Sequence, residues 1–564
     1  MEARFWTKSY PKGINSDVDN NQYNSLTHFF DETFATFAKN EFSTNMGVTY
    51  SYSQMDDMAR NISAWLQSLD LPPRSKVALM MPNVNQYLPI LIGVLRAGHV
   101  LTSVNPLYTA RELKFQLADS DAKVIFILEP FCETLEKVVD DSSVEHVVIS
   151  KIGDMLGSTK GKIVNFAAKY VKKAVPSYTL KSTSHHTVQN LKTVAAKGKK
   201  LPYSRPVQDL DDVVFLQYTG GTTGVAKGIL ITHRNIISAA MQFDAWFAPM
   251  YDELAEDTVI NAIVALPLYH IFAFIVTILG MRRGYHFTLV TNPRDIDGFV
   301  KTLAERSFHI FPGVNTLFQA LLNHPDFKSV DFSQLKISMA GGMAATPATA
   351  AKWREVTGCT MLEGWGMSET LGCGTASPLT STEFSGNIGL PLPGVDISIR
   401  DDDGKPLGIN EEGELCIKGS NVISGYHNLD NSKFFTEDGF LKTGDVAAID
   451  EQGFVKLFDR KKDMLIISGF NVYPNEVEGV LSMHPKVNEC AVVGLEDVEK
   501  GQSIKAFVVK SDDSLTEKEL MQHCKENLTG YKRPRVIEFI GELPKSTVGK
   551  ILRNELREKK PVNA

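Results

Sequence analysis

The residues from Tyr218 to Gly228, YTGGTTGVAKG, have the types and spacing of a phosphate-binding loop. Four glycines let backbone N–H groups approach an anion, three threonine hydroxyls add donors or reach a metal ion, and Lys227 supplies positive charge. The stretch is not a Walker loop, because Ala226 and Gly228 flank Lys227. A flexible turn would explain the glycines alone. The hydroxyls and the lysine directly after an expected buried strand favour a polyphosphate cradle.

Further along the chain, three side chains suit a nucleotide. Trp365 stands between two glycines, where its ring can stack on a base, and Glu369 follows shortly after, where a carboxylate can hold Mg²⁺ beside phosphates. Asp445 ends the turn KTGD and can accept both hydroxyls of a ribose. The alternative for Trp365 is packing in the core, and the alternative for Glu369 is a solvated turn.

Two single residues and one glycine pair complete the candidate set. His270 ends LPLYH, after a proline-containing turn, and such a histidine is more often packed or capping than reactive. Lys550 follows Gly549 near the chain end, where a lone lysine is normally solvated. The glycines of AGGMA, residues 340–344, would let a ligand approach the backbone at a strand end.

The elements that must position these residues alternate in the manner of an α/β protein. Residues 26–66 read mainly as two helical stretches, and KVALMMPN, AKVIFIL and HVVIS are short apolar runs between helix-like segments. The alternation resumes after Tyr218, which predicts two doubly wound sheets in tandem. From about Gly386 alternating strands with Asp-Gly turns predict a small β-barrel-like part. We expect an N-terminal domain over 1–460, with that part at about 386–460, and a small α+β domain over 461–564.

Composition limits the class of protein and its partners. The 564 residues are 43% hydrophobic and 22% charged, as in soluble enzymes. Six scattered cysteines without CxxC spacing argue against a zinc site and fit a reducing cytoplasm, and no secretory signal is expected. The net charge of −7 argues against nucleic acid as a partner. The apolar window 271–281 is too short to span a bilayer and predicts a core helix.

One segment, residues 151–205, is strongly basic, with twelve lysines and arginines against Asp154 alone. Within it, residues 160–175 form an amphipathic pattern, with lysines on one face and an apolar set opposite: Ile163, Phe166, Ala167, Tyr170, Val171 and Ala174. Such a helix can lie on an anionic membrane surface, here the inner face of the cell membrane. The alternative, in which the apolar face packs on the domain, is slightly favoured.

Together, and in this order, the motifs resemble those of the adenylate-forming superfamily of acyl-CoA synthetases, peptide-synthetase adenylation domains and luciferases. The resemblance runs from the first helices to Lys550. Within the superfamily, VALMMPN, VNPLYT, LPLYHIFA, TNPRDI, GFNVYPNEVE and LTGYK look like bacterial long-chain fatty-acid–CoA ligases. The resemblance implies that ATP and a fatty acid form an acyl-adenylate and pyrophosphate, that the C-terminal domain rotates, and that CoA then releases AMP.

The resemblance also implies a role for each site residue. The loop over the β- and γ-phosphates comprises Thr219, Gly220, Gly221, Thr222, Thr223, Gly224 and Lys227. Trp365 and Ser368 border the adenine, Asp445 and Arg460 contact the ribose, and Glu369 with Thr222 holds Mg²⁺. Lys550 bridges the acyl carboxylate and the α-phosphate, beside His270. Lys462 is the hinge, and Gly469 lies where pantetheine passes.

Departures from the family pattern are mild, and none removes a catalytic group. Gly221 stands where many relatives have Ser, and Trp365 replaces the commoner Tyr, which keeps the stacking face but loses a hydroxyl. Two other functions remain open: an adenylating enzyme that passes the acyl group to an acceptor other than CoA, and a lipid-binding scaffold. Chain-length preference is not determined, although Val314, Met343 and Phe274 are guesses at the acyl pocket. A homodimer is one oligomeric state that the sequence allows.

Overall fold

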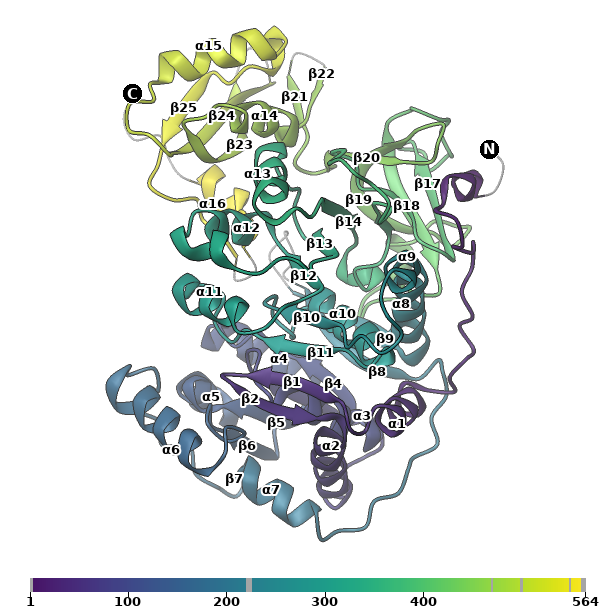
Figure 1. Cartoon of the computed structure of the whole chain (residues 1–564), viewed down its shortest axis with the longest axis vertical. Helices are drawn as coiled ribbons and strands as arrows, with labels where there is room; N and C mark the ends of the chain where they lie inside the picture. The colour runs from purple at the N-terminus through teal and green to yellow at the C-terminus, as the bar shows by residue number, and fades with distance from the viewer. Residues whose placement is uncertain (1–3, 220–225, 468–469, 498–500, 547–548, 559–564) are drawn as a thin grey trace.

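The computed structural model describes residues 4–219, 226–467, 470–497, 501–546 and 549–558. In this part of the chain, two large sheets with helices on both faces form the N-terminal domain, and smaller sheets follow toward the C-terminus (Figure 1). The N-terminal sheets lie in the lower and middle parts of the view, and the C-terminal domain lies at the upper end. The predicted α/β class, with a large N-terminal and a small C-terminal domain, is confirmed.

The first large sheet has seven strands in the described residues, in the order β7-β6-β5-β3-β4-β8-β9. All neighbours are parallel except β8 and β9, which form an antiparallel pair at one edge. Strand bounds are β3 Lys76–Met80, β4 Val100–Ser103, β5 Ala122–Leu128, β6 His146–Ser150, β7 Thr187–Asn190, β8 Val213–Thr219 and β9 Lys227–Thr232. Its helices include α3 Tyr87–Arg96, α4 Ala110–Ser120, α5 Cys132–Glu136 and α7 Leu191–Gly198.

The second large sheet has nine strands in the described residues, in the order β16-β15-β14-β13-β12-β10-β11-β1-β2. Its bounds are β1 Glu41–Asn45, β2 Val48–Ser51, β10 Asn261–Val264, β11 His286–Leu289, β12 Ile310–Gly313, β13 Ile337–Ala340, β14 Met361–Trp365, β15 Thr375–Ala376 and β16 Leu390–Pro391. The helices are α8 His233–Trp246, α9 Ala248–Asp252, α10 Ile271–Arg282, α11 Ile296–Ala304, α12 Asn315–Leu322 and α13 Pro347–Thr357.

The hairpin of β1 and β2, near the start of the chain, belongs to the second large sheet. The two expected helices are α1 Leu26–Thr36 and α2 Tyr52–Gln67, but β1 and β2 lie between them, and β1 pairs in parallel with β11. Phe42 of β1 is fully buried, with its ring 5.5 Å from that of Phe287 on β11. The start of the chain therefore helps to close the second sheet, a long-range pairing that no local pattern indicates.

The apolar segment 271–281 is a core helix, as predicted. Almost all of α10 is buried, and it lies between the two large sheets. Phe274 of α10 packs on Phe215 of β8 with ring centroids 5.1 Å apart. On the other side, a Cβ atom at Gly280 would come within 2.8 Å of the Phe287 ring on β11. Within the described residues, none of the helices has the length and apolar character that crossing a bilayer requires.

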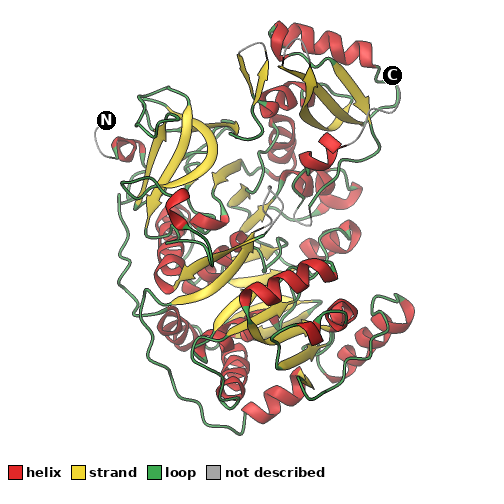
Figure 2. Cartoon of the chain, turned by 180° about the vertical axis from the view of Figure 1, so that it is seen from behind, coloured by secondary structure: helices red, strands yellow, loops and turns green. Residues whose placement is uncertain are grey.

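The barrel-like part is a curved, antiparallel four-stranded sheet in the described residues (Figure 2). Its strands are β17 Val395–Arg400, β18 Gly413–Gly419, β19 Leu441–Ile449 and β20 Val455–Arg460. After it come the strand pair β21 Leu465–Ile467 and β22 Phe470–Val472, then α14 Pro474–Ser482, β23 Val487–Asp497, β24 Gly501–Lys510, α15 Glu517–Asn527, β25 Val536–Phe539 and α16 Arg553–Glu558. These C-terminal elements bury clusters of their own, so they form a separate domain core.

The basic amphipathic segment is helical and contacts the domain through Gly161 and Ala168, but its larger apolar side chains do not pack there. It forms α6 Ser158–Phe166 and continues as a π-helical turn over Ala167–Val171, at the edge of the molecule (Figure 1). Its apolar side chains are among the most exposed hydrophobic residues: Ile163 at 62%, Phe166 at 60%, Tyr170 at 61% and Val171 at 70%. The slightly favoured expectation, a helix buried against the domain by its apolar face, is therefore wrong.

Candidate active site

The nucleotide-binding candidates meet at the carboxyl end of β14 and the β19–β20 pair of the four-stranded sheet. Trp365 ends β14, and its indole Nε1 donates a hydrogen bond of 2.8 Å to Oδ2 of Asp445 on β19. The other oxygen, Oδ1, lies 2.6 Å from Nε of Arg460, which faces Asp445 across the β19–β20 pair. Burial raises the pKa of Asp445, and Arg460 and the indole oppose that rise. These three predicted residues thus form one continuous group.

Glu369 lies in a short 3₁₀ turn, Ser368–Thr370, directly after Ser368. Its side chain is buried, and Oε1 accepts a hydrogen bond of 2.9 Å from the hydroxyl of Tyr426. No cluster of three or more His, Cys, Asp or Glu side chains suited to a metal ion occurs among the described residues. A single carboxylate fits Mg²⁺ nonetheless, since that ion keeps several waters and binds through one or two carboxylates plus substrate phosphates.

The described ends of the predicted phosphate loop are Thr219, the last residue of β8, and Lys227, the first of β9, which pair with each other. Lys227 Nζ lies 4.5 Å from the ring centroid of Phe434 and 5.5 Å from that of Tyr426. Gly220, Gly221, Thr222, Thr223 and Gly224 lie outside the described residues, as does Gly469. The loop therefore connects the paired ends of two antiparallel strands, β8 and β9.

Lys550 reaches the same site from the C-terminal domain. It follows a tight turn in which the backbone N–H of Lys550 donates to Ser546 Oγ at 3.1 Å, and Gly549 adopts a φ of +81°. A Cβ at Gly342, in the AGGMA stretch, would lie 3.6 Å from Lys550 Cε. Burial between the domains lowers the pKa of Lys550, and Arg460 adds to this effect. Lys550 nonetheless remains exposed to solvent.

His270 lies within electrostatic range of Lys550, and its side chain does not cap its helix. It occupies the N-cap position of α10, yet its side chain makes no capping hydrogen bond. Burial, with a smaller contribution from Lys550, lowers the pKa of His270 to about 4. The imidazole is therefore neutral at physiological pH, so it can hydrogen-bond a carboxylate without adding a second fixed charge beside the lysine.

Comparisons with known proteins agree with this arrangement of a nucleotide site and a C-terminal domain. Residues 30–427 match the family model described as AMP-binding enzyme, and residues 476–550 match its C-terminal domain model. The chain belongs to the AMP-binding enzyme family. It is 46% identical over 558 residues to a long-chain-fatty-acid–CoA ligase of Yersinia pestis, and 45% identical over 559 residues to one of Haemophilus influenzae. Each alignment covers 98% of both chains.

Solved structures share the fold of this AMP-binding enzyme. The anthranilate CoA ligase AuaEII in complex with anthranoyl-AMP superposes with a TM-score of 0.80 at 22% identity, covering 96% of this chain and 98% of that one. ATP-bound MatB from Rhodopseudomonas palustris superposes with a TM-score of 0.76 at 25% identity, covering 94% and 98%.

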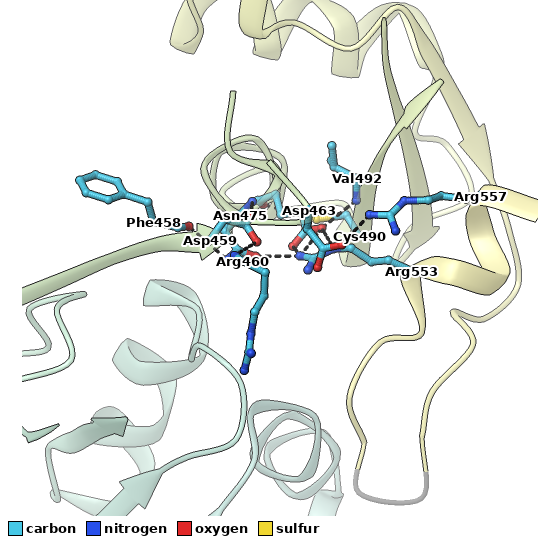
Figure 3. Close-up of polar contacts among 10 residues, drawn as sticks. Phe458, Asp459, Arg460, Asp463, Asn475, Cys490, Val492, Arg553 and Arg557 are labelled. Atoms are coloured by element: carbon cyan, nitrogen blue, oxygen red, sulfur yellow. Dashed lines mark hydrogen bonds and ion pairs between the residues drawn. The ribbon is translucent and has the colours of Figure 1, made fainter. Parts of the chain in front are cut away.

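In this AMP-binding enzyme, the turn that carries Lys550 is held by a partly buried polar network (Figure 3). Arg553, which begins α16, donates to Glu478 Oε2 at 2.7 Å and to Asn475 Oδ1 at 2.7 Å, both on α14. The backbone N–H of Asn475 donates to Asp459 Oδ2 at 2.9 Å, on the last strand before the predicted hinge. The network thus connects the Lys550 turn to the end of β20.

The predicted hinge residue Lys462 lies on an exposed turn between β20 and β21. Its neighbours make contacts to both sides: Lys461 Nζ lies 2.8 Å from Asp402 and 3.1 Å from Glu414 of the four-stranded sheet. Asp463 pairs at 2.6 Å with Arg557 of α16. The turn is therefore tied to the N-terminal domain before Lys462 and to the C-terminal domain after it.

Sequence reasoning missed Tyr426, Phe434 and Asp119. Tyr426 lies 57 positions from Glu369, and Asp119 accepts a 2.6 Å hydrogen bond from Tyr218, 99 positions away. No motif spacing links such pairs, and the sequence signals only that two aromatic residues, Tyr426 and Phe434, stand near each other. Of the acyl-pocket guesses, Val314 lies near Gly342 and Gly549, Met343 is partly buried, and Phe274 belongs to the core between the sheets.

Proposed function

We propose that this chain is an AMP-forming long-chain fatty-acid–CoA ligase that uses ATP, Mg²⁺ and CoA. The names of full-length relatives at 43–46% identity support the substrate. The observation that carries the chemistry is the position of Lys550. It comes from the C-terminal domain, yet it lies close enough to Asp445, Glu369 and His270 for their charges to influence one another.

The reaction has two displacement steps. First, an oxygen of the fatty-acid carboxylate attacks the α-phosphorus of ATP, the bond from that phosphorus to the bridging oxygen breaks, and pyrophosphate leaves. Second, the CoA sulfur, having lost its proton, attacks the acyl carbonyl, and the carbonyl–oxygen bond to AMP breaks. Negative charge gathers at the α-phosphate in the first step, so catalysis depends on positioning and on positive charge.

Each proposed residue role follows from this charge distribution. The Lys550 ammonium bridges the carboxylate and the α-phosphate, and neutral His270 lies beside the acyl carboxylate. Lys227, with residues 219–224, holds the β- and γ-phosphates. Bound Mg²⁺ would neutralise phosphate charge, held by Glu369 with Thr222. The remaining residues bind the other parts of the two substrates: Trp365 and Ser368 at the adenine, Asp445 and Arg460 at the ribose, and Gly469 along pantetheine.

The proposed domain boundary lies between Arg460 and Lys461, with the N-terminal domain over 1–460 and the mobile domain over 461–564. In this arrangement Lys550 faces the adenylation site. For CoA to attack, the C-terminal domain must rotate about Lys462. This rotation takes Lys550 out of the active site and brings Gly469 to the path by which the CoA thiol enters. The contacts of Lys461 and Asp463 on opposite sides of Lys462 support a pivot at this residue.

The alternative is transfer of the acyl group to an acceptor other than CoA. An assay with palmitate, oleate and shorter acids, measuring pyrophosphate release without CoA and AMP release with CoA, separates the two. We expect both products with the long acids. Pyrophosphate without CoA-dependent AMP would favour another acceptor, and no fatty-acid-dependent pyrophosphate would overturn the proposed function.

A second proposal concerns where the enzyme meets its substrate. The exposed side of residues 158–175 presents Ile163, Phe166, Tyr170 and Val171 next to Lys169, Lys172 and Lys173. Apolar side chains inserted at the headgroup boundary, with lysines at the anionic surface, are the binding mode of interfacial helices. We therefore place the protein in the cytoplasm, peripheral to an anionic membrane surface. The homodimer allowed by the sequence stays a proposal, to be measured by sedimentation.

A further inference from the structure

Tyr426 contacts both charged groups that would handle the triphosphate and its metal. We propose that Tyr426 is a positioning residue that holds the Glu369 carboxylate and the Lys227 ammonium in a fixed arrangement, so that one binds Mg²⁺ while the other binds phosphate. This inference rests on the proposed function, since it concerns how the same site receives Mg²⁺ and ATP. The proposal rests on the observation that the Tyr426 side chain contacts both the Glu369 carboxylate and the Lys227 ammonium.

On the Glu369 side, the contact is a hydrogen bond between buried partners. The Tyr426 hydroxyl donates to Glu369 Oε1 at 2.9 Å, and the two residues are only 6% and 8% exposed. Nearby, the backbone N–H of Ile423 donates to the carbonyl oxygen of Glu369 at 3.0 Å. Two bonds from the same loop therefore fix the turn and the rotation of its carboxylate. With Oε1 committed to the phenol, Oε2 is the oxygen left for the metal ion.

On the Lys227 side, the contact is between an ammonium group and aromatic rings. Lys227 Nζ lies 5.5 Å from the centroid of Tyr426 and 4.5 Å from that of Phe434. The two rings pack on each other with centroids 4.4 Å apart and an interplanar angle of 53°. A cation over such rings is attracted by their negative faces. The rings thus restrict Lys227 to one side of the loop.

Tyr426 is itself fixed to the strand that carries Lys227. It forms an antiparallel bridge with Ile229 of β9, and the backbone N–H of Leu230 donates to the carbonyl of Gly425 at 3.1 Å. Its own backbone N–H donates to Asn431 Oδ1 at 2.7 Å. Lys227 and Tyr426 therefore belong to adjacent, hydrogen-bonded segments, and a displacement of one moves the other.

The test separates the hydroxyl from the ring. Tyr426→Phe keeps the contact with Lys227 and removes only the bond to Glu369. ATP binding is titrated by calorimetry without fatty acid, at a series of Mg²⁺ concentrations and without Mg²⁺. We expect the Mg²⁺ concentration for half-maximal ATP binding to rise about tenfold or more, because a hydrogen bond to a charged group is lost. ATP binding without Mg²⁺ should be unchanged.

Phe434→Leu is the converse variant, because it removes a ring from Lys227 and leaves the Tyr426–Glu369 bond. It should weaken ATP binding about two- to fivefold both with and without Mg²⁺. Tyr178→Phe is the matched control: its hydroxyl donates to Glu129 Oε1 at 3.0 Å, on another part of the N-terminal domain, and ATP binding should not change. Thermal unfolding of all variants checks that each folds.

An unchanged Mg²⁺ dependence in Tyr426→Phe would overturn the proposal, as would equal weakening with and without Mg²⁺ in this variant. These results differ from failure of the proposed function. That failure would appear as absent fatty-acid-dependent pyrophosphate release by the unmodified protein, whatever its Mg²⁺-dependent affinity for ATP.

Discussion

The indole N–H of Trp365 donates a 2.8 Å hydrogen bond to the Asp445 carboxylate, which joins the residue at the end of β14 to the four-stranded sheet. From the sequence, tryptophan at this position keeps an aromatic face and loses the hydroxyl of the commoner tyrosine. The structure shows that it also supplies a donor of its own. The donor contacts the residue proposed to bind the ribose, so this hydrogen bond joins the proposed base-stacking residue to the proposed ribose-binding residue.

Trp365→Phe should therefore raise the KM for ATP about tenfold, because it retains a stacking ring but removes a hydrogen bond to a buried carboxylate. Steady-state kinetics at saturating fatty acid and CoA measure this. The matched control is Trp353→Phe, which removes an indole donor to Ser338 Oγ in the core and should lower stability only. An unaltered KM for ATP in Trp365→Phe would contradict a role for this hydrogen bond in ATP binding.

Lys550→Ala should slow acyl-adenylate formation about 100-fold or more, because the charge placed at the α-phosphate is removed. Conversion of supplied acyl-adenylate to acyl-CoA should persist, since the proposed rotation of the C-terminal domain removes the lysine from the site for that step. Fatty-acid-dependent pyrophosphate exchange and thioester formation from acyl-adenylate measure the two steps separately.

The control for Lys550 is Lys545→Ala on the same segment, which breaks an exposed ion pair with Glu489 and should spare both half-reactions. Equal loss of both half-reactions in Lys550→Ala would count against rotation of the C-terminal domain.

His286 should make the protein less stable in mild acid. Burial, with a smaller contribution from Arg306, lowers its pKa to about 4, while Glu41 opposes this shift. The pKa of a histidine in the unfolded chain is about 6.5. Below that pH the unfolded state binds more protons than the folded state, so stability falls as the pH drops toward about 4. At about pH 5.5 the loss from this residue is roughly 1.4 kcal/mol.

Denaturant unfolding at pH 7.5 and 5.5, followed by tryptophan fluorescence, measures that loss. His286→Gln should lose less stability between the two pH values than the unmodified protein, whereas His185→Gln at an exposed site should lose as much. Identical losses in all three proteins would rule out a contribution from His286.

Changing Lys169, Lys172 and Lys173 to Glu should weaken binding to liposomes that contain anionic lipid, by about 1 kcal/mol for each lysine removed from the surface. Catalysis on short, soluble acids should be unaffected. Phe166→Ser with Tyr170→Ser tests the apolar part separately and should weaken binding even at high salt, where charge is screened. Liposome binding that persists unchanged in both variants would exclude this surface.

Much of the site and fold was determined by local sequence. Glycines, threonines and Lys227 after an apolar run predicted a phosphate loop, and alternating strands and helices predicted parallel sheets, because turn chemistry and periodicity are properties of neighbouring residues. The helix at 271–281 and the change to antiparallel strands near residue 386 were predicted on the same basis.

Only the tertiary structure decided which of these pieces meet. Tyr426 reaches Glu369 from 57 positions away, and Lys550, from another domain, lies beside Gly342 of the N-terminal domain. The apolar face of residues 158–175 has the same periodicity as a buried helix, yet it faces solvent. Periodicity specifies that a helix has two unlike faces. Whether one of them is covered depends on the packing of distant segments, which local patterns do not encode.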